Sequence, residues 1–303
     1  MNDIMLIILL LIGLFACIGL GIMLKENIKQ ITNYKYFSLI LLCVFFVGIF
    51  CCVRLGLISF STIKTIFYSI LLLNFLIFFH ELGHFLAALI SKTKVKEFSI
   101  GMGPIIISKE FKNIQYSLRL FLIGGYVQFD DDSFKETHFL KQAFIIANGV
   151  IFNMICALVC CWLYLYATMP TLSLYQIFID GFLMMGMILQ EMYAAIAGLF
   201  KTVDTSSFAG PIGVVNIIST YVKEGYLYVL ELLILFNVNL AVLNFLPIPL
   251  LDGGQFIYIL FKGITKKQEY PKLENILVII GVSFIVLLLI FGLFNDVKNF
   301  IFK

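Results

Sequence analysis

The sequence predicts a polytopic α-helical membrane protein with about six transmembrane helices and a small membrane-associated β-hairpin or sheet insertion. Hydrophobic residues make up 61% of the 303 residues and charged residues only 13%, about half the charged share of a soluble domain. The mean hydropathy is +1.04. Apolar runs of about 20 residues recur along the chain, and this is the length that a helix needs to cross the hydrocarbon core.

Six apolar runs are predicted to span the bilayer. They are Ile4–Met23, Phe37–Val53, Ser59–Ile90, Ala143–Tyr166, Leu227–Leu246 and Leu273–Phe294. The first run lacks the basic n-region and the cleavage site of a signal peptide, so we expect it to be retained. The first two runs form an accessory segment, 1–58, ahead of a core that extends over 59–303.

The polar stretch 91–142 is predicted to be a cytoplasmic, β-rich insertion. Three runs in it are rich in β-branched and aromatic residues and are separated by glycine and proline, which is typical of strands. These runs are Val95–Ile100, Ile105–Lys109 and Ile114–Val127. The aspartates that follow, Asp130–Asp132, indicate a solvated turn.

The distribution of basic residues predicts that both termini face outward. The inner loops, 25–36, 91–142 and 253–272, then hold three, eight and four of the 21 Lys and Arg residues. On this topology the fourth span runs outward and the fifth inward. The apolar run Leu172–Phe200 must then begin and end outside, so we expect 168–226 to be an outer-face segment. In it, that run would lie at the interface or enter the membrane as a hairpin.

One motif in the third span predicts a metal site. The motif is Phe79-His80-Glu81-Leu82-Gly83-His84. On a helix His80 and His84 lie one turn apart on the same face, where both can bind one Zn²⁺, and Glu81 lies beside them as a catalytic base. Glu81 is the only Asp, Glu, Lys or Arg between Ile66 and Ile90, and an unpartnered charge in hydrocarbon is costly. The alternative is a pair of interfacial histidines beside an unrelated glutamate.

A third metal ligand is predicted at Asp252. A catalytic zinc needs three protein ligands and one open position, and no third histidine is suitably placed. The third and fifth spans both run inward, so their C-terminal ends meet at one face. Asp252 follows a Pro-x-Pro break that would unwind the helix, and two glycines after it permit a tight backbone.

Two segments together resemble the site-2 protease family of intramembrane zinc metalloproteases. They are HELGH at 80–84 and NFLPIPLLDGG at 244–254. The similarity extends from about Ile66 to the C-terminus and is closest to the bacterial regulator-of-sigma-E protease group. Further similar segments are KEFSIGMGP at 96–104, IGGYV at 123–127, FAGPIG at 208–213 and FND at 294–296.

The resemblance implies a role for each residue of the site. His80, His84 and Asp252 would bind zinc, Glu81 would be the catalytic base, and Asn244 would contact the substrate backbone. An asparagine in a membrane helix also commonly joins helices, and this alternative stays open for Asn244.

A substrate-binding role is expected for four further residues. The edge strand near Ile123–Val127 would hold an extended substrate by β-addition, with Gly124, Gly125 and Tyr126 in contact with it. Asn153 ends the segment 148–153, which is similar to the family's AGPxxN segment but lacks its proline.

The resemblance predicts an intramembrane zinc metalloprotease that hydrolyses peptide bonds within or near transmembrane segments, in regulated intramembrane proteolysis. Anti-sigma factors or signal-peptide remnants would be examples of its substrates. The expected partners are a transmembrane protein or peptide and the lipid bilayer, with no nucleic acid. We expect a bacterial cytoplasmic membrane, with the active site near the cytoplasmic side.

Three departures separate this chain from the regulator-of-sigma-E protease group: two extra N-terminal spans, the missing proline, and 167–208, which is too short for the PDZ domain that the group inserts there. Two other classes of function remain as alternatives. One is a catalytically silent membrane scaffold and the other is a metal transporter.

Overall fold

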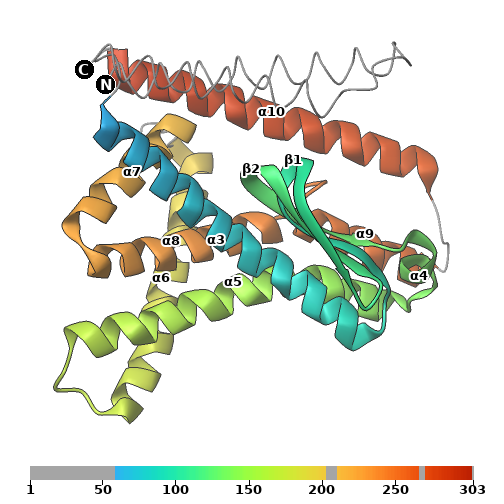
Figure 1. Ribbon diagram of the computed structural model, residues 1–303, viewed down its shortest axis with the longest axis horizontal. Helices are drawn as coiled ribbons and strands as arrows, with labels where there is room; N and C mark the ends of the chain where they lie inside the picture. Colours follow the sequence, from blue (N-terminus) through green and yellow to red (C-terminus); the bar gives the residue numbers. More distant parts are fainter. Residues whose placement is uncertain (1–58, 203–209, 266–269, 302–303) are drawn as a thin grey trace.

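The computed structural model describes residues 59–202, 210–265 and 270–301. The predicted accessory segment 1–58, with its two spans, lies outside the described residues. The described elements, in chain order, are α3 (Phe60–Ser91), β1 (Val95–Phe111), β2 (Ile114–Phe129), α4 (Asp131–Glu136), α5 (Phe139–Thr168), α6 (Leu174–Thr202), α7 (Pro211–Glu224), α8 (Tyr226–Phe245), α9 (Asp252–Thr265) and α10 (Pro271–Ile301) (Figure 1).

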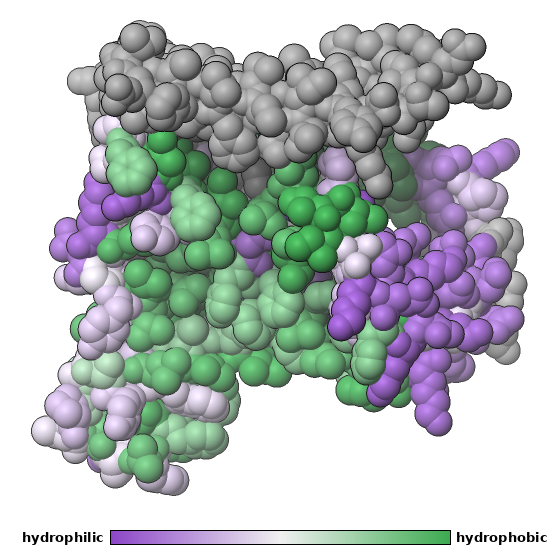
Figure 2. All heavy atoms as spheres, in the orientation of Figure 1, coloured by the Kyte–Doolittle hydropathy of each residue, from purple (hydrophilic) through white to green (hydrophobic). Residues whose placement is uncertain are grey.

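Five helices in the described part of the chain, α3, α5, α6, α8 and α10, are long and apolar enough to cross a membrane. Helix α5 is central, because it packs against α3, α6, α8 and α9. Figure 2 shows apolar side chains across the middle of the molecule and a mass of hydrophilic ones at the end where α4 lies. The predicted fold class, a polytopic helical membrane protein with a small sheet, is confirmed.

The apolar run predicted to lie on the outer face forms one continuous helix, α6. Because the helix does not turn back, the hairpin alternative is wrong. Helix α6 approaches α5 closely at Gly181, where an added Cβ would lie 2.2 Å from the ring of Trp162. In Figure 1, α6 runs across α5 and α8 rather than alongside them, but it is also long enough to span. An interfacial position for α6 stays a prediction.

Helix α3 has the ends that its sequence favours. The Ser59 side chain caps its first turn by accepting a hydrogen bond from Thr62 N, at 3.1 Å. At the other end Lys92 adopts a left-handed conformation (φ 62°) and its N–H reaches the last carbonyls of the helix. The chain then turns directly into β1, and Phe85 of α3 packs against Phe98 of β1 with ring centroids 5.0 Å apart. This contact holds the sheet against the helix that carries the motif.

The insertion is a two-stranded antiparallel sheet of β1 and β2, not three separate strands. The glycines at 101 and 103, with φ of 85° and 83°, bend β1 but do not end it. Residues 97–100 have ladder partners on two sides, in 115–118 and in 125–128 of β2. Within the described chain, 125–128 have ladder partners in 97–100 alone, so this stretch is one edge of the sheet.

Two short helices stand where the sequence favours loops. Asp130 begins α4 by accepting a hydrogen bond from Ser133 N at 3.0 Å, so the aspartate run is an N-terminal cap and not a plain turn. The first half of the predicted basic loop 253–272 forms α9. This helix was not predicted, but its cause is visible in the sequence: Ile259 recurs at helical spacing with Phe256 and Leu260, and it is buried against the start of α5.

Candidate metal centre and adjoining strand edge

His80 and His84 lie side by side on the face of α3 that packs against α5. Both are nearly inaccessible, with exposed fractions of 6% and 7%. Two glycines let the helices approach this closely. An added Cβ on Gly149 of α5 would lie 2.4 Å from His84 Nε2, and one on Gly83 would lie 2.3 Å from the carbonyl oxygen of Asn148. The imidazoles are thus held between two helices.

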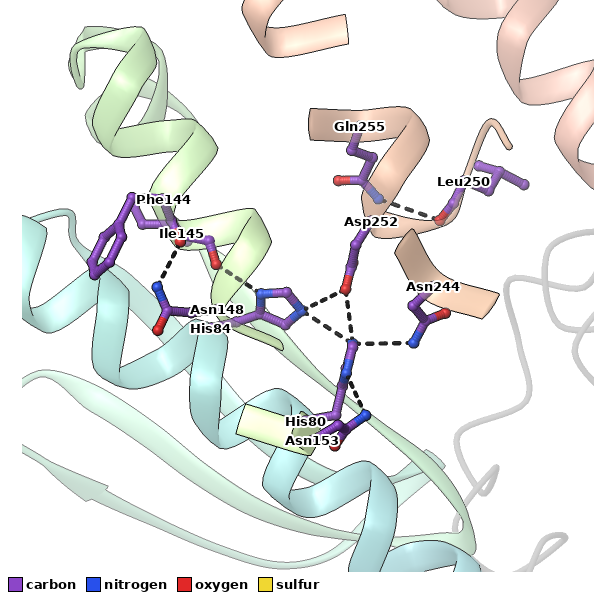
Figure 3. A network of polar contacts seen from close by, with 10 residues as sticks. All are labelled: His80, His84, Phe144, Ile145, Asn148, Asn153, Asn244, Leu250, Asp252 and Gln255. Atoms are coloured by element: carbon purple, nitrogen blue, oxygen red, sulfur yellow. Dashed lines mark hydrogen bonds and ion pairs between the residues drawn. The ribbon is translucent and has the colours of Figure 1, made fainter. Parts of the chain in front are cut away.

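Asp252 joins the histidines from a different part of the chain. Its Oδ2 atom lies 2.9 Å from His80 Nε2 and 3.3 Å from His84 Nε2, and the two Nε2 atoms are 3.3 Å apart (Figure 3). We refer to His80, His84 and Asp252 as the metal cluster. Burial raises the pKa of Asp252, but the two neighbouring imidazoles, when they are protonated on Nε2, lower it further, to about 2. The carboxyl group is therefore anionic, which is the form that binds a metal.

A strained turn brings Asp252 to this position. Helix α8 ends at Phe245, and two prolines follow. Leu250 then has a positive φ of 76°, an uncommon value for a branched residue. Gly253, the second residue of α9, packs against the end of α8, where an added Cβ would lie 2.3 Å from the carbonyl oxygen of Phe245. The Pro-x-Pro break and the glycines act here as the sequence predicts.

The other nitrogen of each imidazole contacts α5. His84 Nδ1 lies 2.9 Å from the carbonyl oxygen of Ile145. A carbonyl can only accept, so the proton of neutral His84 is on Nδ1 and its Nε2 carries a free lone pair. His80 Nδ1 lies 3.1 Å from the side-chain amide of Asn153, a residue with no exposed surface. Both histidines therefore present Nε2 toward Asp252.

These residues fit a zinc ion. With the protons on Nδ1, two nitrogen lone pairs and one carboxylate oxygen converge, and such a set requires a cation among them. The ligand atoms of the metal cluster all lie within 4.8 Å of one another. Two imidazoles and one carboxylate are a donor set typical of catalytic zinc, which keeps a further position open.

The amide of Asn153 also bears on this fit. Its Oδ1 atom has no hydrogen-bond partner among the described residues, while its Nδ2 atom faces His80. The oxygen and nitrogen of a side-chain amide are interchangeable by rotation. Rotation would direct Oδ1 to the Nδ1 proton of His80, which is the arrangement that leaves His80 Nε2 free for a metal.

Glu81 lies next to the edge of the sheet. An added Cβ on Gly125 would lie 3.5 Å from Glu81 Cγ and 3.9 Å from a methyl carbon of Ile77, so no side chain separates this edge from α3. The Glu81 carboxyl group also lies near the backbone of Val127. A carboxyl group, three candidate ligands and a strand edge thus meet in one place.

The structure separates the residues expected to bind substrate. Asn244, at the end of α8, directs Nδ2 toward His80 Nε2 at 3.4 Å and so borders the metal cluster. Gly125 borders Glu81, whereas Gly124, with φ 109°, packs against Met102. The Tyr126 hydroxyl donates to Glu97 and points into the sheet. Asn153 contacts His80, which places it behind the metal cluster (Figure 3).

Several residues that shape the site carried no sequence signal of their own. The carbonyl of Ile145 belongs to an ordinary helical residue, and Gly149 lies in the family-like segment 148–153 but had no role assigned to it. Their places follow only from the packing of α5 against α3. Glu97 and Arg119 lie in alternating segments, where charges usually mark a solvated face.

Comparison with known proteins finds one matching family model, described as peptidase family M50, over residues 68–288. Several similar proteins carry the printed name "Putative zinc metalloprotease". The one from Campylobacter jejuni (Cj1068) is 25% identical, over 77% of this chain and 93% of the relative. The one from Rickettsia conorii (RC0203) is 22% identical, over 76% and 97%. A third, from Thermotoga maritima, is 35% identical over 34% of this chain and 21% of its own length.

Proposed function

Because this chain belongs to peptidase family M50 and is a zinc metalloprotease, we propose that it cleaves peptide bonds within or near transmembrane segments of other membrane proteins. The observation that carries the proposal is the metal cluster, which lies beside Glu81 and a strand edge inside a bundle of apolar helices. A protease working on soluble proteins would have no need to enclose its site in this way.

His80, His84 and Asp252 would hold the zinc ion. When bound, Zn²⁺ supplies Lewis-acid chemistry, which polarises a carbonyl and makes water acidic near neutral pH. The contacts of His84 with Ile145 and of His80 with Asn153 would fix both rings, so that the ligands need not reorganise during the reaction. In this proposal Asn153 orients His80 and does not contact substrate.

Glu81 would act as the general base. It follows His80 directly, so its carboxyl group lies next to the metal cluster and faces the strand edge at Gly125. From there it can take a proton from the attacking water and later pass it to the leaving amine. Asn244 borders the cluster on the other side and could donate its amide hydrogen to the substrate carbonyl. This position favours substrate contact over a helix-joining role for Asn244.

We expect a helical substrate to unwind and bind along the strand edge. The backbone groups of a transmembrane helix are hydrogen-bonded within the helix, so the segment must unwind before its peptide bond is accessible. An unwound segment needs new partners for those groups, and an unpaired strand edge supplies them. Gly125 allows such a strand to approach Glu81 without a side chain in between.

A finer proposal concerns location and physiological role. We place the site near the cytoplasmic face of a bacterial membrane, because the basic stretch 91–142 begins where α3 ends, and the hydrophilic end of the molecule lies at α4 within that stretch (Figures 1 and 2). Regulated intramembrane proteolysis, or removal of signal-peptide remnants, would suit a site that accepts single transmembrane segments.

The test is cleavage of a defined substrate by the purified, zinc-loaded protein in proteoliposomes. We expect a single-span model substrate to be cut within its transmembrane segment, with the bond identified by mass spectrometry and the activity lost when zinc is removed by a chelator. Transport of zinc across the vesicle without cleavage would instead favour the metal-transporter alternative. Binding of the substrate without cleavage or transport would favour the scaffold.

A further inference from the structure

A second cluster of buried polar groups lies on the face of the sheet that points away from α3. Glu97 of β1 has an exposed fraction of 7%, and its carboxylate accepts hydrogen bonds from the hydroxyl groups of Ser117 and Tyr126 and from Arg119. Arg119 Nη2 donates to both carboxylate oxygens, at 2.8 and 3.1 Å, and Nε donates to one of them at 3.3 Å. Burial raises the pKa of Glu97, but the three donors together lower it below its ordinary value, so the group is anionic. We refer to these four residues as the Glu97 cluster.

Arg119 connects the Glu97 cluster to the bend in β1. Its Nη1 donates to the carbonyl oxygen of Gly103 at 2.6 Å, and its guanidinium lies over the ring of Tyr126, 5.3 Å from the centroid. The cluster therefore joins three stretches of chain: the start of β1, the middle of β2 and the sheet edge near Tyr126. An interior ion pair with this many partners holds a fixed geometry, because loss of either Glu97 or Arg119 would leave the other charge unpaired.

Tyr126 belongs to the edge that faces Glu81. In the ladder Gly125, Tyr126 and Val127 pair with Ile100, Ser99 and Phe98. Successive residues of a strand point to opposite faces. Gly125 faces α3 and Glu81, while the Tyr126 side chain extends to the Glu97 carboxylate on the other side of the sheet. The Glu97 cluster thus fixes the edge strand through Tyr126, on the face opposite to Glu81.

The ladder by itself specifies the register of this edge weakly. Residues 125–128 pair regularly with 97–100, but this stretch of ladder is short. A register shift between Val95 and Glu97 borders it on one side, and two glycines with positive φ, Gly101 and Gly103, border it on the other. A strand next to irregular pairing and glycine can slip, and a slip of one residue moves the backbone by about 3.3 Å and turns each side chain to the other face. The Glu97 cluster supplies the fixed points that the ladder lacks.

We propose that Glu97 and Arg119 are positioning residues that fix the register of the edge strand 125–128 against Glu81, and thereby decide which peptide bond of the substrate is cut. This inference rests on the proposed function, because it requires a substrate paired with that edge. A substrate strand takes its register from the strand it pairs with. A displaced edge would therefore present a neighbouring carbonyl to Glu81 and the metal cluster.

The test compares cleavage positions in four proteins: wild type, Glu97→Gln, Arg119→Lys and a matched control, Lys96→Gln. Lys96 is the neighbour of Glu97 in β1 and forms an exposed ion pair with Asp130, 3.2 Å long, on the outside of the sheet. Each protein is loaded with zinc and given the same single-span substrate, and mass spectrometry measures the fraction of product cut at each bond.

We expect wild type and Lys96→Gln to cut mainly at one bond. Glu97→Gln and Arg119→Lys should redistribute cleavage to bonds one or two residues away while zinc content stays at one per chain. Loss of sheet stability alone would lower the yield of active protein but would leave the cleavage position unchanged. Tyr126→Phe removes one hydrogen bond and keeps the ring, so it should shift the cleavage position to a smaller extent. This variant provides the test if Glu97→Gln and Arg119→Lys do not accumulate as folded protein.

An unchanged product distribution in zinc-loaded Glu97→Gln, Arg119→Lys or Tyr126→Phe would overturn the positioning role and leave the protease assignment intact. A wild-type protein that cuts no transmembrane segment would overturn the proposed function and this inference with it. The two failures are therefore distinguished by the wild-type digest.

Discussion

The metal cluster and the Glu97 cluster are both buried polar groups built around one carboxylate, yet they differ in how that carboxylate is satisfied. Glu97 has its own cation in Arg119, and two hydroxyl groups complete its shell. Asp252 faces two imidazoles whose other nitrogens are engaged with α5. The first cluster is complete within the protein, whereas the second needs a cation from outside. Buried charge that the chain leaves unbalanced is thus the better indicator of a ligand site.

The largest difference between the clusters should follow removal of the Asp252 charge. Asp252→Asn replaces a carboxylate with a neutral amide, and we expect zinc affinity to fall by more than about 100-fold, beyond the loss typical of an outer partner. Metal titration of purified protein followed by elemental analysis measures this. Asp130→Asn, at the exposed end of the sheet, is the control and should bind one zinc. Unchanged zinc affinity in Asp252→Asn would remove this residue from the ligand set.

In the Glu97 cluster, a second substitution should restore part of the stability that the first one removes. Arg119→Met leaves Glu97 buried without its cation, and we expect a loss of about 3–5 kcal/mol in stability. Adding Glu97→Met removes the stranded charge, so the double variant should be more stable than Arg119→Met alone. Denaturant unfolding in detergent measures the three free energies. A double variant less stable than the single one would show that Glu97 is not stranded by loss of Arg119.

A smaller effect is expected where α5 supports the metal cluster. Asn153→Ala should weaken zinc binding by about 10- to 100-fold, because His80 loses the group that orients its ring. Asn148→Ala is the matched control on the same helix, since the Asn148 amide donates to the Phe144 carbonyl, at 2.8 Å, and to neither histidine. Equal zinc affinity in both variants would show that Asn153 does not orient His80.

The sequence predicts the parts of this arrangement that depend on local spacing. His80 and His84 share a face because four residues make one helical turn, and Glu81 stands out because nothing else near it is charged. Asp252 was predictable because a Pro-x-Pro break and two glycines mark a place where the backbone must turn. The spans α3, α5, α8 and α10 follow from apolar length alone.

The remaining features depend on contacts between distant segments. Nothing in the sequence near Asn153 indicates that it contacts His80. Tyr126 is expected to bind substrate, but its hydroxyl group donates a hydrogen bond to Glu97 instead. The sheet has two bent strands because β1 continues through its glycines, which usually indicate a break. Helix α9 is not predicted, because the lysines at its end and after it favour a loop. These features are decided by packing, which no single segment encodes.

The central claim is that Glu81 acts on substrate beside a zinc ion held by the metal cluster. Glu81→Gln tests it most directly, because the variant keeps the shape of the side chain and removes its basicity. We expect one zinc per chain in both proteins and a fall in the cleavage rate of about 10²- to 10⁴-fold in the variant, measured on the same single-span substrate. A zinc-loaded Glu81→Gln protein that cleaves at the wild-type rate would contradict it.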